Sequence, residues 1–186
     1  MSLAQDLDRH LPADDREAED LRRIRDFVRR HPDPFDRRIH EGHLTGSALV
    51  LSASGHRVLL LHHRKLGRWL QPGGHADPAD ASGEAVALRE AREETGIEGL
   101  FLHPAAPRPL DVDIHAIPAR DGEPAHEHLD VRYLVLAPDE AALAPARDET
   151  NDLRWFAWEE LAGLDLDPGL RRALAKARAA LGARQG

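Results

Sequence analysis

The sequence contains no cysteine among its 186 residues. This absence excludes disulfides, zinc sites built from thiolates and a cysteine nucleophile. Aromatic residues are scarce at 4%, but 41% of the chain is apolar, which suffices for the core of one domain. The N-terminal stretch MSLAQDLDRHLPADD has no basic flank or apolar centre, and no run approaches the roughly 18 apolar residues that span a bilayer. We therefore expect a cytoplasmic protein without membrane contacts.

Positive charge is also in short supply, because the formal net charge is −8. Binding to a long polyphosphate backbone draws most of its energy from Lys and Arg. The charge therefore disfavours extended nucleic acid as a partner. Small phosphorylated ligands remain compatible with it if metal ions neutralise the site.

Apolar periodicity predicts a mixed α/β domain behind a helical segment. Residues Asp15 to Arg30 form an amphipathic pattern that ends at HPDPFD, so we assign residues 1–40 to an N-terminal helical extension and residues 41–186 to the main domain. The extension is compatible with a cap, a dimer arm or a packing helix. Strands are expected at 47–53, 57–63, 109–118, 128–137 and 153–158, with helices over 82–95 and from 168 onward. This order predicts a mixed sheet in an α/β/α sandwich.

Three glutamates share one face of the helix expected over 82–95. Glu90 lies about 60° from Glu93 and about 40° from Glu94 around a helix axis. Each like-charged pair at this spacing costs about 0.2–0.5 kcal/mol on an isolated helix. A hard divalent cation, Mg²⁺ or Mn²⁺, would relieve the repulsion, because carboxylate oxygens are its preferred ligands. A solvated acidic face is the alternative.

The surrounding segment, LQPGGHADPADASGEAVALREAREETGI (70–97), resembles the Nudix box of hydrolases that cleave a nucleoside diphosphate linked to another group. The second half of that motif reads R-E-U-x-E-E-x-G-U, where U is a bulky aliphatic residue. Residues 89–97 fill it, with the small Ala91 at the first aliphatic position. The first half departs from the pattern. Gly74 and Asp80 match its glycine and glutamate only if the loop carries a one-residue insertion within 73–97.

The resemblance implies the Nudix α/β/α fold over roughly residues 43 to 180, and it implies roles for individual residues. Glu93 and Glu94 become the principal metal ligands, and Glu90 becomes a ligand or the base that activates water. Arg89 orients Glu90 or Glu93, with support from Asp80.

Two further metal ligands are implied by the resemblance. The Gly73 carbonyl is one of them. The other is Glu149, which stands six residues ahead of Trp155 as a family carboxylate does. A surface-loop acid is the alternative for Glu149. The cofactor implied by this set of oxygen ligands is Mg²⁺ or Mn²⁺.

The histidines are considered separately. His126, His128 and Asp130 alternate in HEHLD, so on a strand they point to one side. This spacing can bind a transition metal, but beside a Nudix box we favour a strand face that contacts substrate or is hydrogen-bonded. His75, next to the box, is a further candidate for substrate contact.

The function predicted from the sequence is metal-dependent hydrolysis of a diphosphate linkage in a nucleoside diphosphate derivative. The partner is then a small-molecule nucleotide, and a homodimer is compatible with the family. The main alternative is a Nudix module that binds ADP-ribose-like ligands without cleaving them. A plain cation-binding domain is another, whereas the related isopentenyl diphosphate isomerase needs an active-site cysteine that is missing here. ADP-ribose, dinucleoside polyphosphates, oxidised nucleoside triphosphates and nucleotide sugars all remain open as substrates.

Overall fold

The computed structural model describes residues 2–120, 122–138, 141–144 and 150–182. The helices are α1 (Leu3–Asp8), α2 (Asp15–Arg30), α3 (Gly83–Thr95), the short 3₁₀ helix η1 (Glu160–Gly163) and α4 (Pro168–Gly182). The strands are β1 (Gly42–Leu51), β2 (Arg57–His63), β3 (Arg68–Leu70), β4 (Gly73–His75), β5 (Phe101–Leu102), β6 (Asp111–Ile117), β7 (His126–Leu136) and β8 (Thr150–Ala157).

The eight strands of the described residues belong to one sheet with β1 near its middle. β1 runs parallel to β7 over its whole length, and every other pairing is antiparallel. The predicted mixed sheet is therefore confirmed. The sequence did not indicate β3, β4 and β5, because runs of two or three residues are too short to show an alternating pattern.

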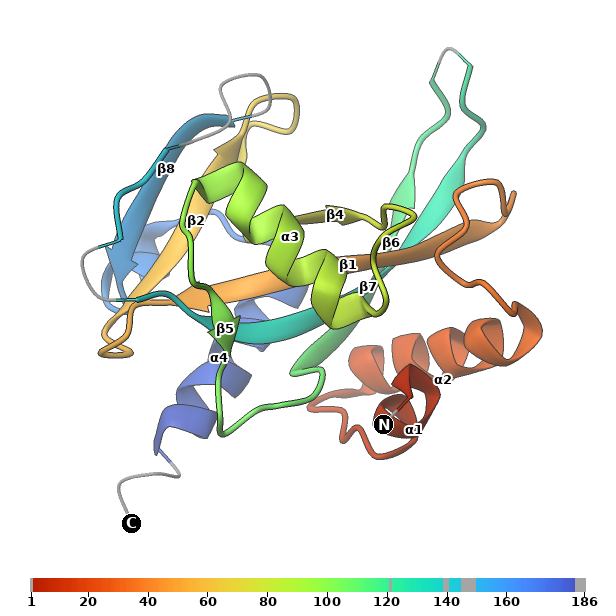
Figure 1. Ribbon diagram of the computed structural model, residues 1–186, viewed down its shortest axis with the longest axis horizontal. Helices are drawn as coiled ribbons and strands as arrows, with labels where there is room; N and C mark the ends of the chain where they lie inside the picture. The colour runs from red at the N-terminus through yellow and green to blue at the C-terminus, as the bar shows by residue number, and fades with distance from the viewer. Residues whose placement is uncertain (1, 121, 139–140, 145–149, 183–186) are drawn as a thin grey trace.

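Side-chain alternation along the central strands divides the core between the two faces of the sheet. On one face, Leu44, Ala48 and Val50 of β1 pack in a cluster with the buried side chains of α2 and α3. On the other face, Leu49 and Leu51 pack in a cluster with α4. Figure 1 shows α3 in front of the sheet and α4 behind it. The predicted α/β/α arrangement is confirmed.

The N-terminal segment packs on the domain as a structural element. Leu21, Ile24 and Phe27 of α2 are buried in the α3-side cluster. The carboxylates of Glu17 and Asp20 on the same helix accept hydrogen bonds from backbone N–H groups of β6. Among the alternatives that the sequence left open, the packing helix is the one observed. The additional helix α1 was not anticipated.

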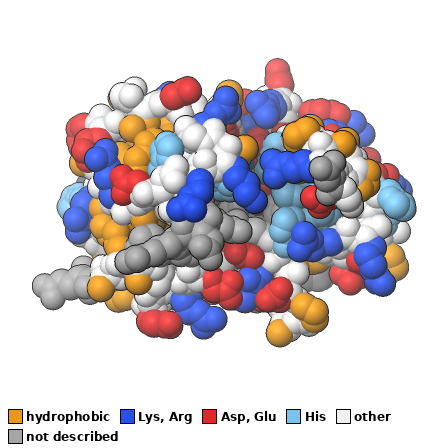
Figure 2. All heavy atoms as spheres, turned by 90° about the horizontal axis from the view of Figure 1, so that it is seen from above, with side chains coloured by type: hydrophobic (Ala, Val, Ile, Leu, Met, Phe, Trp, Pro, Cys, Tyr) orange, Lys and Arg blue, Asp and Glu red, His pale blue; other side chains and the backbone are white. Residues whose placement is uncertain are grey.

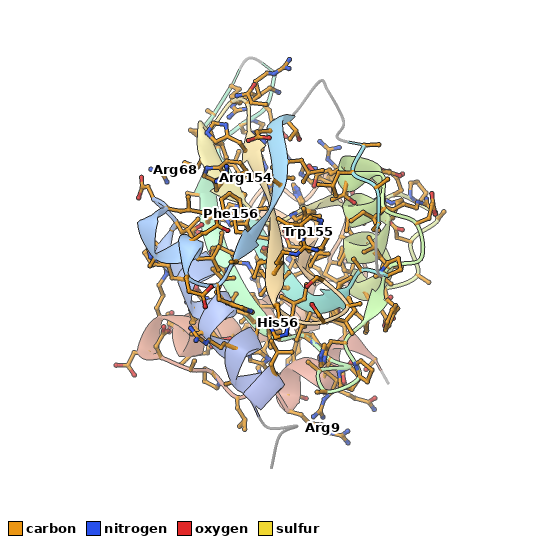
Figure 3. All side chains as sticks on the ribbon, turned by 90° about the vertical axis from the view of Figure 1, so that its left-hand side faces the viewer. Arg9, His56, Arg68, Arg154, Trp155 and Phe156 are labelled. Carbon is orange, nitrogen blue, oxygen red and sulfur yellow. The ribbon has the colours of Figure 1, made fainter. Side chains whose placement is uncertain are left out.

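Strand β8 covers the edge of the sheet beside β2 and places alternate residues on opposite sides. Arg154 and Phe156 lie together on one side and Trp155 is directed to the other (Figure 3). The guanidinium carbon of Arg154 is 4.3 Å from the centre of the Phe156 ring and 5.5 Å from that of Trp69. None of the helices in the described residues is long and apolar enough to cross a membrane.

Candidate active site

Helix α3 begins and ends at the residues expected from the sequence. The Ser82 side chain caps the first turn by accepting a hydrogen bond from the N–H of Ala85, and Gly96 ends the helix in the left-handed conformation at φ 70°. Ala87 and Ala91 are fully buried against the sheet. Their packing fixes the rotation of the helix, and the glutamates consequently turn toward the edge of the sheet at β4.

Arg89 connects the glutamates to the preceding loop. Its Nη1 donates to one carboxylate oxygen of Glu90 and to one of Glu93, both at 3.0 Å. Its Nη2 donates to the His75 carbonyl at 2.6 Å and to Asp80 at 2.9 Å, and Nε donates to Asp80 as well. A single guanidinium thus holds the helix, the β4 segment and the loop in one arrangement.

The Pro-Gly-Gly turn brings backbone against the carboxylates. The Gly73 N–H donates to Glu94 Oε2 at 2.9 Å. A β-carbon on Gly74 would lie 2.7 Å from the carboxyl carbon of Glu90, and one on Gly73 would lie 2.2 Å from Ser47 Oγ. Side chains at these two positions would collide with the site, so the close approach requires glycine.

Burial and ion pairing shift the ionisation of this group. Burial raises the pKa of Glu90, although the neighbouring Arg89 charge opposes that shift. For Asp80, burial acts to raise the pKa, but hydrogen bonds from Arg89 and from the Asp77 N–H outweigh it and lower the value. The Arg89 pKa is raised by Asp80 and Glu90 against the effect of its own burial. Arg89 is therefore a permanent cation, and Glu90 holds its proton more readily than an ordinary glutamate.

The glutamates line one wall of a cavity of about 1170 Å³. The floor of the cavity is the part of the sheet that α4 leaves uncovered. On β7, Leu134 and Leu136 pack under α4. The even-numbered residues 126–132 of the same strand line the cavity instead. Cationic side chains from five segments also line the cavity: Arg16, Arg37, Lys65, Arg68 and Arg120. Figure 2 shows histidine side chains gathered next to Lys and Arg on this upper face of the molecule.

A buried ion network supports the floor. Arg132 is 3% exposed and donates to Asp130, Asp111 and Asp113 at 2.9, 3.2 and 3.2 Å. Burial disfavours its charge, but these three carboxylates raise its pKa. Asp130 also accepts hydrogen bonds from the side chains of Thr45 and Ser47. The Asp130 carboxylate is thus hydrogen-bonded to structural partners. It lies on the same face of β7 as His126 and His128, as the alternation of these residues suggested.

The three histidines named from the sequence lie together. His75 Nε2 is 3.1 Å from His128 Nε2, which is 3.3 Å from His126 Nε2. Two more rings, those of His43 and His115, lie within 5.4 Å of the His128 ring, centre to centre. Burial lowers the pKa of His43 and His75 to about 4 and that of His128 to about 2, so these rings are neutral near pH 7.

His43 and His115 escaped the sequence analysis because only strand register reveals them. His43 pairs with His128 across β1 and β7, and His115 pairs with His128 across β6 and β7. Arg16 and Arg37, which come from the N-terminal extension, were also missed. They line the cavity because α2 and the loop after it fold against β6 and β1.

Comparison with known proteins shows the family of this chain. The model of the NUDIX domain family matches residues 42–177. The chain belongs to this family. The span agrees with the range of roughly 43 to 180 expected from the resemblance to the Nudix box. No protein of curated function matches the chain.

Solved structures show the same Nudix fold. The chain is similar to a MutT NUDIX hydrolase from Burkholderia pseudomallei, with 28% identity, a TM-score of 0.54 and coverage of 73% of this chain and 98% of that one. An Ap4A hydrolase from C. elegans gives a TM-score of 0.59 at 19% identity, covering 75% and 98%. The NUDIX domain of Shewanella oneidensis NrtR, solved with ADP ribose, gives 0.52 at 22% identity, covering 74% and 87%.

The acidic wall of this Nudix domain fits a hard divalent cation. Arg89 occupies one oxygen each of Glu90 and Glu93, and among the described residues the other oxygen of each has no hydrogen-bond partner. The Glu93 side chain is 52% exposed, whereas Glu94 is 8% exposed. These residues present oxygen atoms to the cavity, which is the ligand type that Mg²⁺ and Mn²⁺ prefer. Glu149 lies outside the described residues.

Proposed function

We propose that this Nudix protein is a Mg²⁺- or Mn²⁺-dependent hydrolase of a diphosphate linkage in a nucleoside diphosphate derivative. The observation that carries the proposal is the convergence of Glu90, Glu93 and Glu94 on one wall of a large cavity that is otherwise rich in cationic side chains. Carboxylates that bind a cation and cationic side chains that bind phosphate oxygens are both needed to hold a diphosphate, and here both line the same cavity.

In this proposal Glu93 and Glu94 hold the cation, with the Gly73 carbonyl and Glu149 as further ligands. Glu94 is fixed by the N–H of Gly73, so its carboxylate has little freedom to move. Once bound, the cation neutralises phosphate oxygens and acidifies water. We expect the arginines that line the cavity to bind the remaining phosphate charge and orient the leaving group.

Glu90 is proposed as the general base. It is half-buried beside Gly74, and burial raises its pKa, which makes its carboxylate a stronger base than that of an exposed glutamate. Arg89 acts as a positioning residue, since it contacts both Glu90 and Glu93 and anchors them to Asp80.

The test is a panel of ADP-ribose, dinucleoside polyphosphates, nucleotide sugars and nucleoside triphosphates, incubated with Mg²⁺ or Mn²⁺ and read by the phosphates released. We expect turnover of at least one member, reduced at least 100-fold in Glu93→Gln and Glu94→Gln. Glu84→Gln is the matched control, because Glu84 lies exposed in the first turn of the same helix. Saturable binding without turnover of any member would contradict the proposal and support a binding module instead.

A further inference from the structure

A group of histidines on the cavity floor is distinct in chemistry from the acidic wall. His43 of β1 and His128 of β7 are direct neighbours in the parallel register, and His75 extends from β4 on the other side of β1. One ring nitrogen from each of the three lies within 4.8 Å of the others. The fold therefore brings three imidazoles from three strands to one point.

His43 is the least satisfied member of this group. It is 1% exposed, and neither of its ring nitrogens has a hydrogen-bond partner among the described residues. A buried imidazole with two unmade hydrogen bonds is unfavourable unless another ligand binds it. The ring is surrounded by His75, His126 and His128, with centres 5.0–5.2 Å away.

Hydrogen bonds within the group cannot satisfy all of its nitrogens. His126 Nδ1 is 2.9 Å from the Pro124 carbonyl, which can only accept, so Nδ1 carries the proton. In the neutral ring, Nε2 of His126 is then a bare acceptor, 3.3 Å from His128 Nε2. His128 Nε2 also lies 3.1 Å from His75 Nε2. If His128 Nε2 carries a proton, it donates to both neighbours at once or to only one of them; if it accepts a hydrogen bond from His75, His126 Nε2 has no donor. In either case His43 receives no hydrogen bond among the described residues.

We propose that His43, His75 and His128 bind a transition-metal dication of the zinc class, at a site separate from the glutamates of α3. Imidazole nitrogen suits Zn²⁺ and its neighbours, whereas Mg²⁺ selects oxygen. Zn–N bonds of about 2.0–2.1 Å place two ligands of a tetrahedral ion about 3.3–3.4 Å apart, close to the spacing of His75 and His128. A small movement of the His43 ring completes the triad.

Two of the three proposed ligands face the cavity, so an ion bound by them would be open to the cavity on that side. His75 and His128 line the cavity, whereas His43 lies beneath it. Three protein ligands with an open fourth position are the arrangement in which zinc also binds a water or an anionic ligand. The cavity would then hold two cation sites that differ in ligand type, one with the carboxylate oxygens of the α3 glutamates and one with imidazole nitrogens.

The experiment uses untagged, full-length protein, stripped of metal and titrated calorimetrically with Zn²⁺ in a large excess of Mg²⁺. We expect one Zn²⁺ per chain, with affinity reduced at least tenfold in His75→Gln and in His128→Gln. His56→Gln is the control, because His56 is exposed in the turn between β1 and β2 and lies far from the cavity-lining Arg68 (Figure 3). Replacing Zn²⁺ by Co²⁺ should produce the visible absorption of a four-coordinate site.

Two further variants keep the proposal falsifiable. Glu93→Gln should retain full Zn²⁺ affinity, because the proposed site does not use that carboxylate. His43→Gln should lose Zn²⁺ affinity while remaining folded by circular dichroism. If the His43→Gln protein does not fold, the Zn²⁺ affinities of the variants at the half-buried His75 and His128 test the proposal. Absence of Zn²⁺ binding by the wild type, or binding that Glu93→Gln abolishes and His75→Gln leaves unchanged, would overturn the proposal. Neither result depends on whether the protein hydrolyses a diphosphate.

Discussion

The close approach of Gly74 to Glu90 leaves no room for a side chain at position 74. The space that a side chain on Gly74 would fill is taken by the Glu90 carboxylate. The glycine thus supports the position of a charged group, and its replacement should move that group without disturbing the core.

We predict that Gly74→Ala lowers kcat at least tenfold while changing the unfolding free energy by less than about 1 kcal/mol. The added methyl group displaces the flexible end of Glu90, which can swing into the cavity. Gly163→Ala is the control, since a β-carbon there meets no heavy atom within 4 Å in the structure. Turnover and thermal unfolding of both variants check the prediction, and unchanged kcat in Gly74→Ala would contradict it.

A second prediction for a single residue concerns Arg89. Arg89→Lys keeps the charge but loses the planar donor set that reaches Asp80, the His75 carbonyl and two glutamates. We expect kcat to fall about 10- to 100-fold, with Mn²⁺ affinity weakened as well. Arg92→Lys, on the exposed side of the same helix, should match the wild type in both measurements. Equal effects of the two substitutions would argue against a positioning role.

Helix α2 is joined to the domain by a buried carboxylate. The Glu17 side chain is fully buried and accepts hydrogen bonds from His10, from the N–H of Ala13 and from Lys176 of α4. It therefore connects the N-terminal loop, α2 and α4. Burial opposes the charge, but the hydrogen bonds from His10 and Lys176 lower the Glu17 pKa from 4.5 to about 2.

We predict that Glu17→Gln lowers the unfolding free energy by about 3 kcal/mol at neutral pH, because it removes the carboxylate nearest to Lys176 and leaves the Asp111 carboxylate, 3.8 Å away, as its ion-pair partner. A carboxylate whose pKa is lower in the folded state than in the unfolded state stabilises the fold at pH values above its unfolded-state pKa. This contribution is lost as the pH falls toward the folded-state pKa. The difference between wild type and variant should therefore shrink between pH 4.5 and about 2. Urea unfolding across pH measures it. Glu19→Gln, on the exposed face of α2, should leave stability unchanged.

The long elements were predictable from the sequence for physical reasons. Helices α2 and α3 carry both an apolar stripe and a capping residue, Asp14 and Ser82 respectively, so their starting residues could be read directly. β1 is longer than expected, beginning at Gly42 rather than residue 47. Its first residues, GHLT, are mostly not apolar, and their strand conformation comes from pairing with β7.

At the scale of the whole molecule, the cavity collects charges that are distant in sequence. Arg16 and Arg37 precede the family domain, whereas Lys65, Arg68 and Arg120 come from loops and strand ends within it. The acidic wall could be predicted because one helix contains it. The cationic lining could not be predicted, nor could the place of His43 and His115 beside His75, His126 and His128, because these features depend on strand register and loop packing that local patterns do not encode.

This lining leads to a prediction about binding. Arg37→Gln should raise KM about fivefold with little change in kcat, since it removes a phosphate contact worth about 1 kcal/mol and leaves the glutamates in place. Arg38→Gln is the neighbouring control, because Arg38 is exposed, pairs with Asp36 and does not line the cavity. Steady-state kinetics on whichever substrate the panel identifies will check it. A larger effect of Arg38→Gln would contradict the assignment.

The central claim is that Glu90, Glu93 and Glu94 gather around a divalent cation. The most direct measurement is anomalous diffraction from crystals of the wild-type protein soaked in Mn²⁺. The account predicts one strong peak at about 2.0–2.2 Å from carboxylate oxygens of Glu93 and Glu94, and no such peak in Glu93→Gln crystals. An empty site in the wild type, with Glu90 and Glu93 still paired to Arg89, would contradict it.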